Sequence, residues 1–152
     1  MNNNTQPRNG ISRLQIRLGL LITLIGLVVY LIGATPEIFG LNRSLPMGFI
    51  QIAVLLIGLG IMCFGGFIIS SRFWIGTEKS IVADIGQRLV ATGYLIAVVT
   101  GGADLIGLGT HPFPLIPYFG PWQAFGVLVG EAVILAGFLM MIPYSHKPNN
   151  KL

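Results

Sequence analysis

The sequence has few charged residues for its length. Of its 152 residues, 9% are charged and 53% are hydrophobic, and the mean hydropathy is +0.80. A soluble domain carries about 25% charged residues, and a chain with far fewer has too little polar surface to cover its outside. This deficit excludes an ordinary soluble domain and indicates that lipid is the solvent.

Cysteine, histidine and the motifs of soluble enzymes are scarce as well. The single cysteine, Cys63, lies in an apolar run, and both histidines, His111 and His146, lie outside the apolar runs. A haem held by two histidines inside the membrane is therefore excluded, and no clustered spacing of Cys, His, Asp or Glu indicates a metal site. We expect no cofactor, no metal and no enzymatic activity.

What the sequence does have is four long apolar runs. At 1.5 Å per residue, about 20 such residues cross the hydrocarbon core of a bilayer. The predicted spans are 18–35, 48–71, 85–109 and 122–142, between a polar basic tail at 1–17 and a polar tail at 143–152. Pro36 ends the first run, and Thr77 or Ser80 is expected to cap the helix that leads into the third. The predicted fold is an all-α integral membrane protein, whose domain at 18–142 is an up-down bundle of four transmembrane helices.

Basic residues set the expected topology. The net charge of +4 comes from Lys and Arg at the ends of the apolar runs, which argues for membrane topology and against nucleic-acid binding. One side carries Arg8, Arg13, Arg17, Arg72, Lys79, Arg88, Lys147 and Lys151, and the other carries only Arg43. Cytoplasmic flanks are enriched in Lys and Arg, so both termini are predicted to be cytoplasmic, and short loops fit a prokaryotic cell inner membrane. A cleaved signal peptide is the alternative for the first run, which is longer than the usual apolar region of such peptides.

The two halves of the chain resemble each other. An offset of 72 aligns Gly48, Gln51, Gly58 and Gly65 with Gly120, Gln123, Gly130 and Gly137, and Arg17-Leu18 and Arg88-Leu89 open the two halves. These matches suggest two tandem helical hairpins related by an axis along the membrane normal. Chance matching of an abundant residue is the alternative.

Two carboxyl groups are the candidate proton or cation site. Glu131 lies near the middle of the last span, and an ionised carboxylate at that depth costs at least about 2 kcal/mol and normally faces protein or water. It is either a proton or cation site or a neutral group that ties two helices together. Asp104 follows Gly101-Gly102. If the third helix ends there, Asp104 lies in the outer interface; if it continues, the two carboxyl groups lie within about 6 Å in depth and share a proton or bind a cation.

Glycines and aromatic residues complete the candidate positions. Glycines at spacings typical of helix packing are Gly19, Gly26, Gly33, Gly58, Gly65, Gly126, Gly130 and Gly137. Small residues let helices approach closely, so we expect packing within the bundle, with packing against another subunit as the alternative. Trp74, Tyr118 and Trp122 are expected to anchor the membrane interface. Gln51 and Gln123 are expected to form interhelical or interfacial hydrogen bonds.

These features give two hypotheses for function. The lack of a soluble domain, of a catalytic constellation and of a polar pathway favours a non-enzymatic accessory or assembly subunit, whose partners are the lipid bilayer and other membrane subunits. The alternative is a small proton- or cation-coupled transporter, assembled as a homo-oligomer, in which Glu131 is the coupling carboxylate. A membrane-embedded enzyme would need more polar residues at one depth than this sequence offers.

Overall fold

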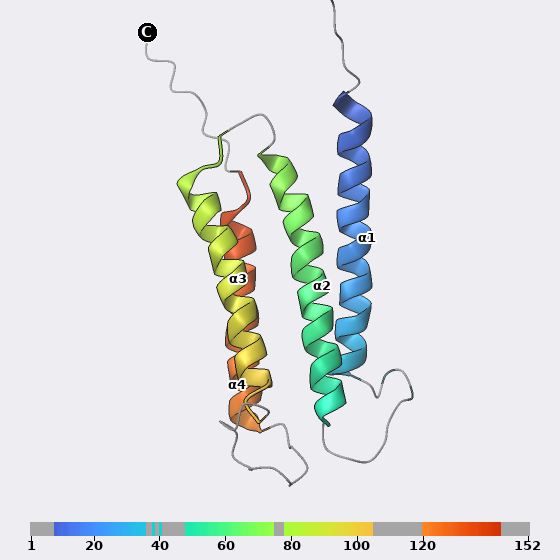
Figure 1. The fold of residues 1–152 in the computed structure, drawn as a ribbon, viewed down its shortest axis with the longest axis vertical. Coiled ribbons are helices and arrows are strands. Elements are labelled where there is room, and N and C mark those ends of the chain that lie inside the picture. Colours follow the sequence, from blue (N-terminus) through green and yellow to red (C-terminus); the bar gives the residue numbers. More distant parts are fainter. Residues whose placement is uncertain are drawn as a thin grey trace, which may run out of the picture.

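The protein is an all-helical membrane protein with four long helices. The structure, a computed structural model, describes residues 8–35, 38, 40, 48–74, 78–104 and 120–143. Its helices are α1 (Arg8–Ala34), α2 (Phe49–Phe73), α3 (Ile81–Gly101) and α4 (Pro121–Met140), and the described residues contain no strand (Figure 1). All four are long and apolar enough to cross a membrane. The predicted all-α fold with four transmembrane helices is confirmed.

The first helix begins earlier than the predicted span. It starts at Arg8, inside the segment 1–17 that the sequence suggested as a tail. Its 27 residues are about 40 Å long at 1.5 Å per residue, whereas the hydrocarbon core is about 30 Å thick. The extra length is the N-terminal part of α1 that precedes the apolar run and includes Arg13 and Arg17.

The third helix is shifted toward the N-terminus relative to the predicted span of 85–109. It begins at Ile81, where the side chain of Ser80 accepts a hydrogen bond from the N–H of Ala83 at 3.2 Å. It ends at Gly101, and residues 102–104 form a turn. Thr77, the other candidate cap, and residues 105–109 lie outside the described residues.

Consecutive helices form two tightly packed hairpins with glycines at the contacts. A Cβ built on Gly26 of α1 would lie 2.5 Å from the N atom of Met62 on α2, and one built on Gly93 of α3 would lie 2.7 Å from the carbonyl oxygen of Gly130 on α4. Real Cβ atoms essentially never approach other atoms this closely. Glycine is therefore what allows the two backbones of each hairpin to meet.

The two hairpins repeat the same packing. Four contacts of the first hairpin each have a counterpart in the second. The contact of Gly26 with Met62 corresponds to that of Gly93 with Ile134, and the contact of Gly19 with Gly65 to that of Gly86 with Gly137. Likewise, Gly58 with Tyr30 corresponds to Gly130 with Ala97, and Gly65 with Thr23 to Gly137 with Val90. Equivalent residues of the second helices, α2 and α4, differ by 72 in residue number, as Gly58 and Gly130 do. Equivalent residues of the first helices, α1 and α3, differ by 67, as Gly26 and Gly93 do. Pairing Arg17 with Arg88 was therefore wrong, because the connection at 102–120 is longer than the one at 35–48.

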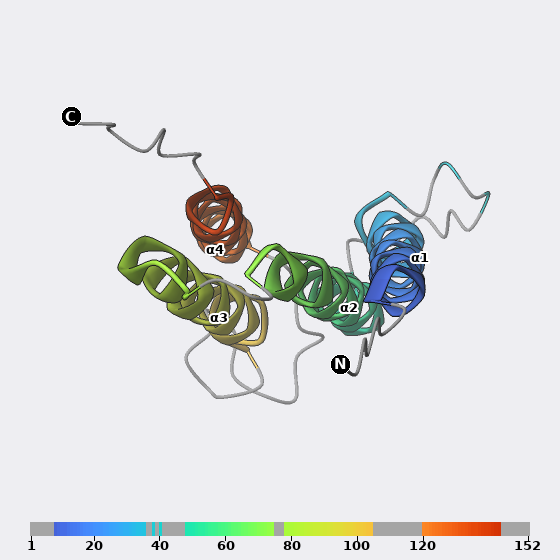
Figure 2. The same cartoon turned by 90° about the horizontal axis from the view of Figure 1, so that it is seen from above.

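The hairpins meet through α2. Seen from the end of the bundle, α2 lies between α1 and the second hairpin, and α1 lies at the edge (Figure 2). Gly60 of α2 faces the ring of Tyr94 on α3, and Gly66 faces the ring of Phe138 on α4. The buried core comprises Leu59 of α2 and five residues of the second hairpin, Val90, Ala97, Val127, Ile134 and Met141. No Cα atom of α1 lies within 8 Å of one in α4. Any contact between these two helices is therefore made by side chains and not by the backbones.

Candidate functional site

The central feature of the site is a hydrogen bond across the gap between α1 and α4. The hydroxyl of Tyr30 on α1 donates to the carboxyl group of Glu131 on α4, with 2.7 Å between Tyr30 Oη and Glu131 Oε1. Among the described residues, this is the only hydrogen bond between these two helices. Glu131 therefore points into the protein, toward the other hairpin.

Tyr30 is a site residue that the sequence analysis missed. Its signal was present, since a tyrosine within an apolar span has a hydroxyl that needs a hydrogen-bond partner when it is buried. In the sequence, this residue is part of the apolar run 18–35. The partner of the carboxyl group is a neutral hydroxyl.

A crevice of about 680 Å³ opens beside this pair, between α1, α2 and α4. Most of its lining is apolar: Leu59, Met62 and Ile69 come from α2, and Leu128, Ile134, Leu135, Phe138 and Leu139 come from α4. The side chains of Leu128, Leu135 and Leu139 are exposed. The crevice is therefore open at the side of the bundle, where the hydrocarbon of a bilayer would lie.

The remaining polar groups in the crevice are neutral side chains. Thr23 donates its hydroxyl to the carbonyl oxygen of Gly19 at 2.8 Å, while Cys63 and the buried Ser70 line the α2 wall. Among the lining residues that the structure describes, none is Lys, Arg or His. Glu131 is the one carboxyl group among these described lining residues, and no basic side chain among them lies beside it.

Asp104 is not part of this site. It lies in the turn that follows α3, and it does not line the crevice. The paired-carboxylate hypothesis required the third helix to continue past Gly102, but α3 ends at Gly101. The structure therefore brings Glu131 together with Tyr30 and not with Asp104.

Of the predicted interface anchors, two lie among the described residues. The indole N–H of Trp74, after the end of α2, donates to the carbonyl oxygen of Met141 after α4 at 3.2 Å. This bond links the two hairpins at the end of the bundle where the first begins. Trp122 is 83% exposed near the start of α4, and Tyr118 lies outside the described residues.

Both glutamines cap their own helices. The side chain of Gln51 accepts a hydrogen bond from the N–H of Gly48 at 3.0 Å, and that of Gln123 accepts one from the N–H of Gly120 at 2.9 Å. Of the two predicted alternatives, interhelical or interfacial bonds, these bonds are not interhelical: each lies at the start of its own helix, where an uncapped N–H is the nearest donor. The shared cap is a further feature that the two hairpins repeat.

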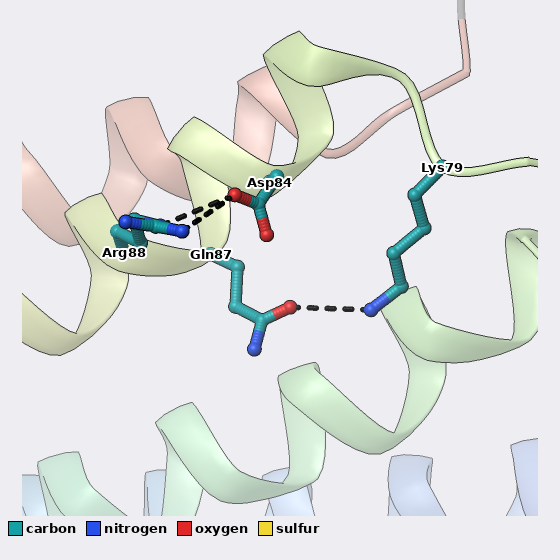
Figure 3. Close-up of polar contacts among 4 residues, drawn as sticks. All are labelled: Lys79, Asp84, Gln87 and Arg88. Carbon is teal, nitrogen blue, oxygen red and sulfur yellow. Dashed lines mark hydrogen bonds and ion pairs between the residues drawn. The ribbon is translucent and has the colours of Figure 1, made fainter.

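A polar cluster marks the beginning of α3 (Figure 3). The guanidinium group of Arg88 lies 3.1 Å from the carboxylate of Asp84, one helical turn earlier. Nearby, the ammonium group of Lys79 donates to the side-chain oxygen of Gln87 at 3.2 Å. These side chains are separate from the crevice, so Arg88 does not neutralise Glu131.

No family model, curated protein or solved structure matches this chain. Function therefore has to be argued from the site itself.

Proposed function

We propose that this chain is a small proton- or cation-coupled carrier of a prokaryotic inner membrane, with Glu131 as the coupling carboxylate. The observation that supports the proposal is the 2.7 Å hydrogen bond between Tyr30 and Glu131 beside a crevice open to the side. An ionisable residue inside a membrane span carries a large desolvation penalty and typically belongs to an ion or proton pathway.

The chemistry of the crevice supports exchange at this carboxyl group. A protonated Glu131 is neutral and needs no counter-charge, but an ionised one needs a cation, because the described part of the lining offers no basic side chain. A proton and a cation therefore compete for one carboxylate. Such competition couples the binding of one to the release of the other.

A static tie between two helices is the alternative role for Glu131. Hydrogen bonds that serve only to hold a protein interior together are surrounded by side chains at close-packed density. The Tyr30–Glu131 bond instead adjoins a crevice of about 680 Å³. That space favours a site that a ligand enters.

The accessory-subunit hypothesis has no comparable support. It would be favoured by an exposed face that a bilayer cannot cover. The exposed side chains of α1 are apolar, among them Leu20, Leu21 and Leu24, and lipid covers such a face as well as a partner helix does. The accessory role stays a prediction that co-purification of a partner protein would support.

The orientation follows from charge. α1 begins and α4 ends at the same end of the bundle (Figure 1), and α3 begins there too with Lys79 and Arg88 close by. Cytoplasmic flanks of membrane proteins are enriched in Lys and Arg. We therefore place this end, and with it both termini, in the cytoplasm.

Liposomes containing the purified chain and an internal pH-sensitive dye test the carrier proposal. Gradients of Na⁺, K⁺ and phenyltrimethylammonium are imposed one at a time, and we expect one of them to drive protons in the opposite direction. Glu131→Gln should abolish this proton movement, because its side chain cannot bind and release a proton. Glu78→Gln, which removes an exposed carboxyl group before α3, should leave it unchanged. Proton movement retained in Glu131→Gln would contradict the proposal.

A further inference from the structure

We infer that the crevice binds a lipophilic organic cation, which enters from the side of the bundle and replaces the proton on Glu131. This inference rests on the proposed coupling role of Glu131 and adds the chemical class of the ligand. It is carried by the size of the crevice, by its lining and by the place at which it opens.

The size and lining of the crevice fit an organic molecule. Its volume of about 680 Å³ falls within the range of roughly 300–1,000 Å³ typical of sites for drug-sized ligands, which are mostly apolar with a few polar groups. Leu59, Met62 and Phe138 line the walls, and Tyr30 and Glu131 supply the polar groups. One carboxyl group in an apolar crevice matches a ligand with one positive charge and an apolar body.

An inorganic cation fits the same crevice poorly. Hard cations are held by about six oxygen ligands. Besides Glu131 and Tyr30, the lining side chains that the structure describes offer the hydroxyl oxygens of Thr23 and Ser70 and no further carboxyl group. Within the described part of the chain, no three His, Cys, Asp or Glu side chains gather at one place. An organic cation needs no such shell, because its charge is spread over a larger group.

Aromatic rings in the lining add to this preference. Tyr30 and Phe138 both line the crevice, and the tip of the Phe138 ring packs against Gly66, where a Cβ would be 2.7 Å from its nearest ring carbon. The faces of such rings attract organic cations, more strongly where water is excluded. The carboxylate and the rings together favour a cation over a neutral lipid chain.

The opening of the crevice indicates the route of entry. Leu128, Leu135 and Leu139 are exposed at its α4 edge. A lipophilic cation partitions into the bilayer and meets this edge directly. A neutral lipid chain could enter by the same route, and it is the outcome against which the test is designed.

Isothermal titration calorimetry with tetraphenylphosphonium tests the inference on the full chain in lipid nanodiscs. Two buffers with different ionisation enthalpies report the number of protons released. We expect one cation per chain, release of one proton, and binding that tightens about tenfold per pH unit while Glu131 is protonated. Glu131→Gln should bind at least about tenfold more weakly and release no proton, as expected for removal of a charge partner.

A matched pair of substitutions on α4 separates filling of the crevice from a general effect on the helix. Ala132 lines the crevice, whereas Ala136, one helical turn further on and also exposed, does not. Ala132→Phe should weaken binding of tetraphenylphosphonium about tenfold or more, since a ring would occupy the space of the ligand. Ala136→Phe should leave binding unchanged, and equal loss in both variants would contradict the inference.

Neutral triphenylphosphine oxide, which carries similar aryl groups, tests the role of charge and should not displace tetraphenylphosphonium. Displacement by this compound, or binding that is equal in Glu131→Gln and independent of pH, would show that the crevice takes up apolar molecules without regard to charge and would overturn the inference.

If tetraphenylphosphonium does not bind while Na⁺ or K⁺ drives proton movement that depends on Glu131, the inference is wrong and the carrier proposal stands. If no cation drives such movement either, both are wrong.

Discussion

The contacts inside the two hairpins differ from the contacts between them. Inside a hairpin, backbone meets backbone: a Cβ on Gly130 would lie 2.8 Å from the N atom of Ala97. Between the hairpins, side chains make the contacts, such as the hydrogen bond from Tyr94 to the carbonyl oxygen of Leu56 at 3.4 Å, and a crevice of about 680 Å³ remains. The glycine pattern thus builds the two-helix units, and the polar groups and the space available for function lie where one unit meets the other.

The largest effect should follow from a methyl group inside a hairpin. Gly130→Ala places a Cβ 2.6 Å from the carbonyl oxygen of Gly93, so one backbone has to move, at a cost of about 1–3 kcal/mol in the free energy of unfolding. Unfolding in mixed micelles, followed by circular dichroism, measures the loss. Gly48→Ala is the control, because a Cβ at Gly48 would meet no atom within 4 Å. Equal stability of the two variants would contradict the packing described for the hairpins.

A smaller effect is expected for the hydrogen bond between the hairpins. Tyr30→Phe, Glu131→Gln and the double variant form a cycle in which the coupling energy should be about 1 kcal/mol, as found for side-chain hydrogen bonds between membrane helices. The same unfolding assay provides the four free energies of unfolding, those of the wild type and of the three variants. A coupling energy of zero would mean that these side chains do not interact in the folded protein.

The effect of removing the hydrogen bond of Trp74 between the hairpins should be smaller still. Trp74→Phe removes the indole N–H that donates to the carbonyl oxygen of Met141 and should lower the free energy of unfolding by about 0.5–1 kcal/mol. Trp122→Phe makes the same chemical change at a side chain that is 83% exposed and should have no effect. An equal loss in both variants would show that the indole ring, and not its hydrogen bond, is responsible.

The smallest effect is expected at the exposed ion pair that begins α3. Asp84→Asn breaks the pair with Arg88 and should lower the free energy of unfolding by less than about 0.5 kcal/mol, because water and salt screen exposed charges. The difference should shrink further when the ionic strength is raised. Glu78→Gln, which removes a carboxylate before the helix begins, is the matched control, and a loss that does not respond to salt would contradict an electrostatic origin.

The sequence predicts the helices well because long runs without charge leave few alternatives. The glycine stripes of the first hairpin could also be read directly, since Gly19, Gly26 and Gly33 follow a regular spacing. Gly86 and Gly93 were missed, because the two halves were aligned on Arg17 and Arg88 and the longer second connection shifts α3 relative to that alignment. Unequal connections are therefore enough to hide half of a repeat.

The site itself could be predicted only in part. Glu131 stands out because a carboxyl group inside an apolar run is rare. Its partner Tyr30 lies 101 residues away in sequence, on a helix whose backbone does not approach α4. That pairing depends on how the two hairpins are placed, which neither hydropathy nor glycine spacing specifies.

Infrared difference titration of Glu131 in lipid, with Glu131→Gln to identify its band, tests the exchange of a proton at this carboxyl group most directly. The carrier proposal predicts a protonated carboxyl band that disappears reversibly as the pH rises, that shifts in Tyr30→Phe, and that tetraphenylphosphonium removes at constant pH. A carboxyl band that persists at every pH and in the presence of the cation would identify Glu131 as a fixed tie between the hairpins and contradict the proposal.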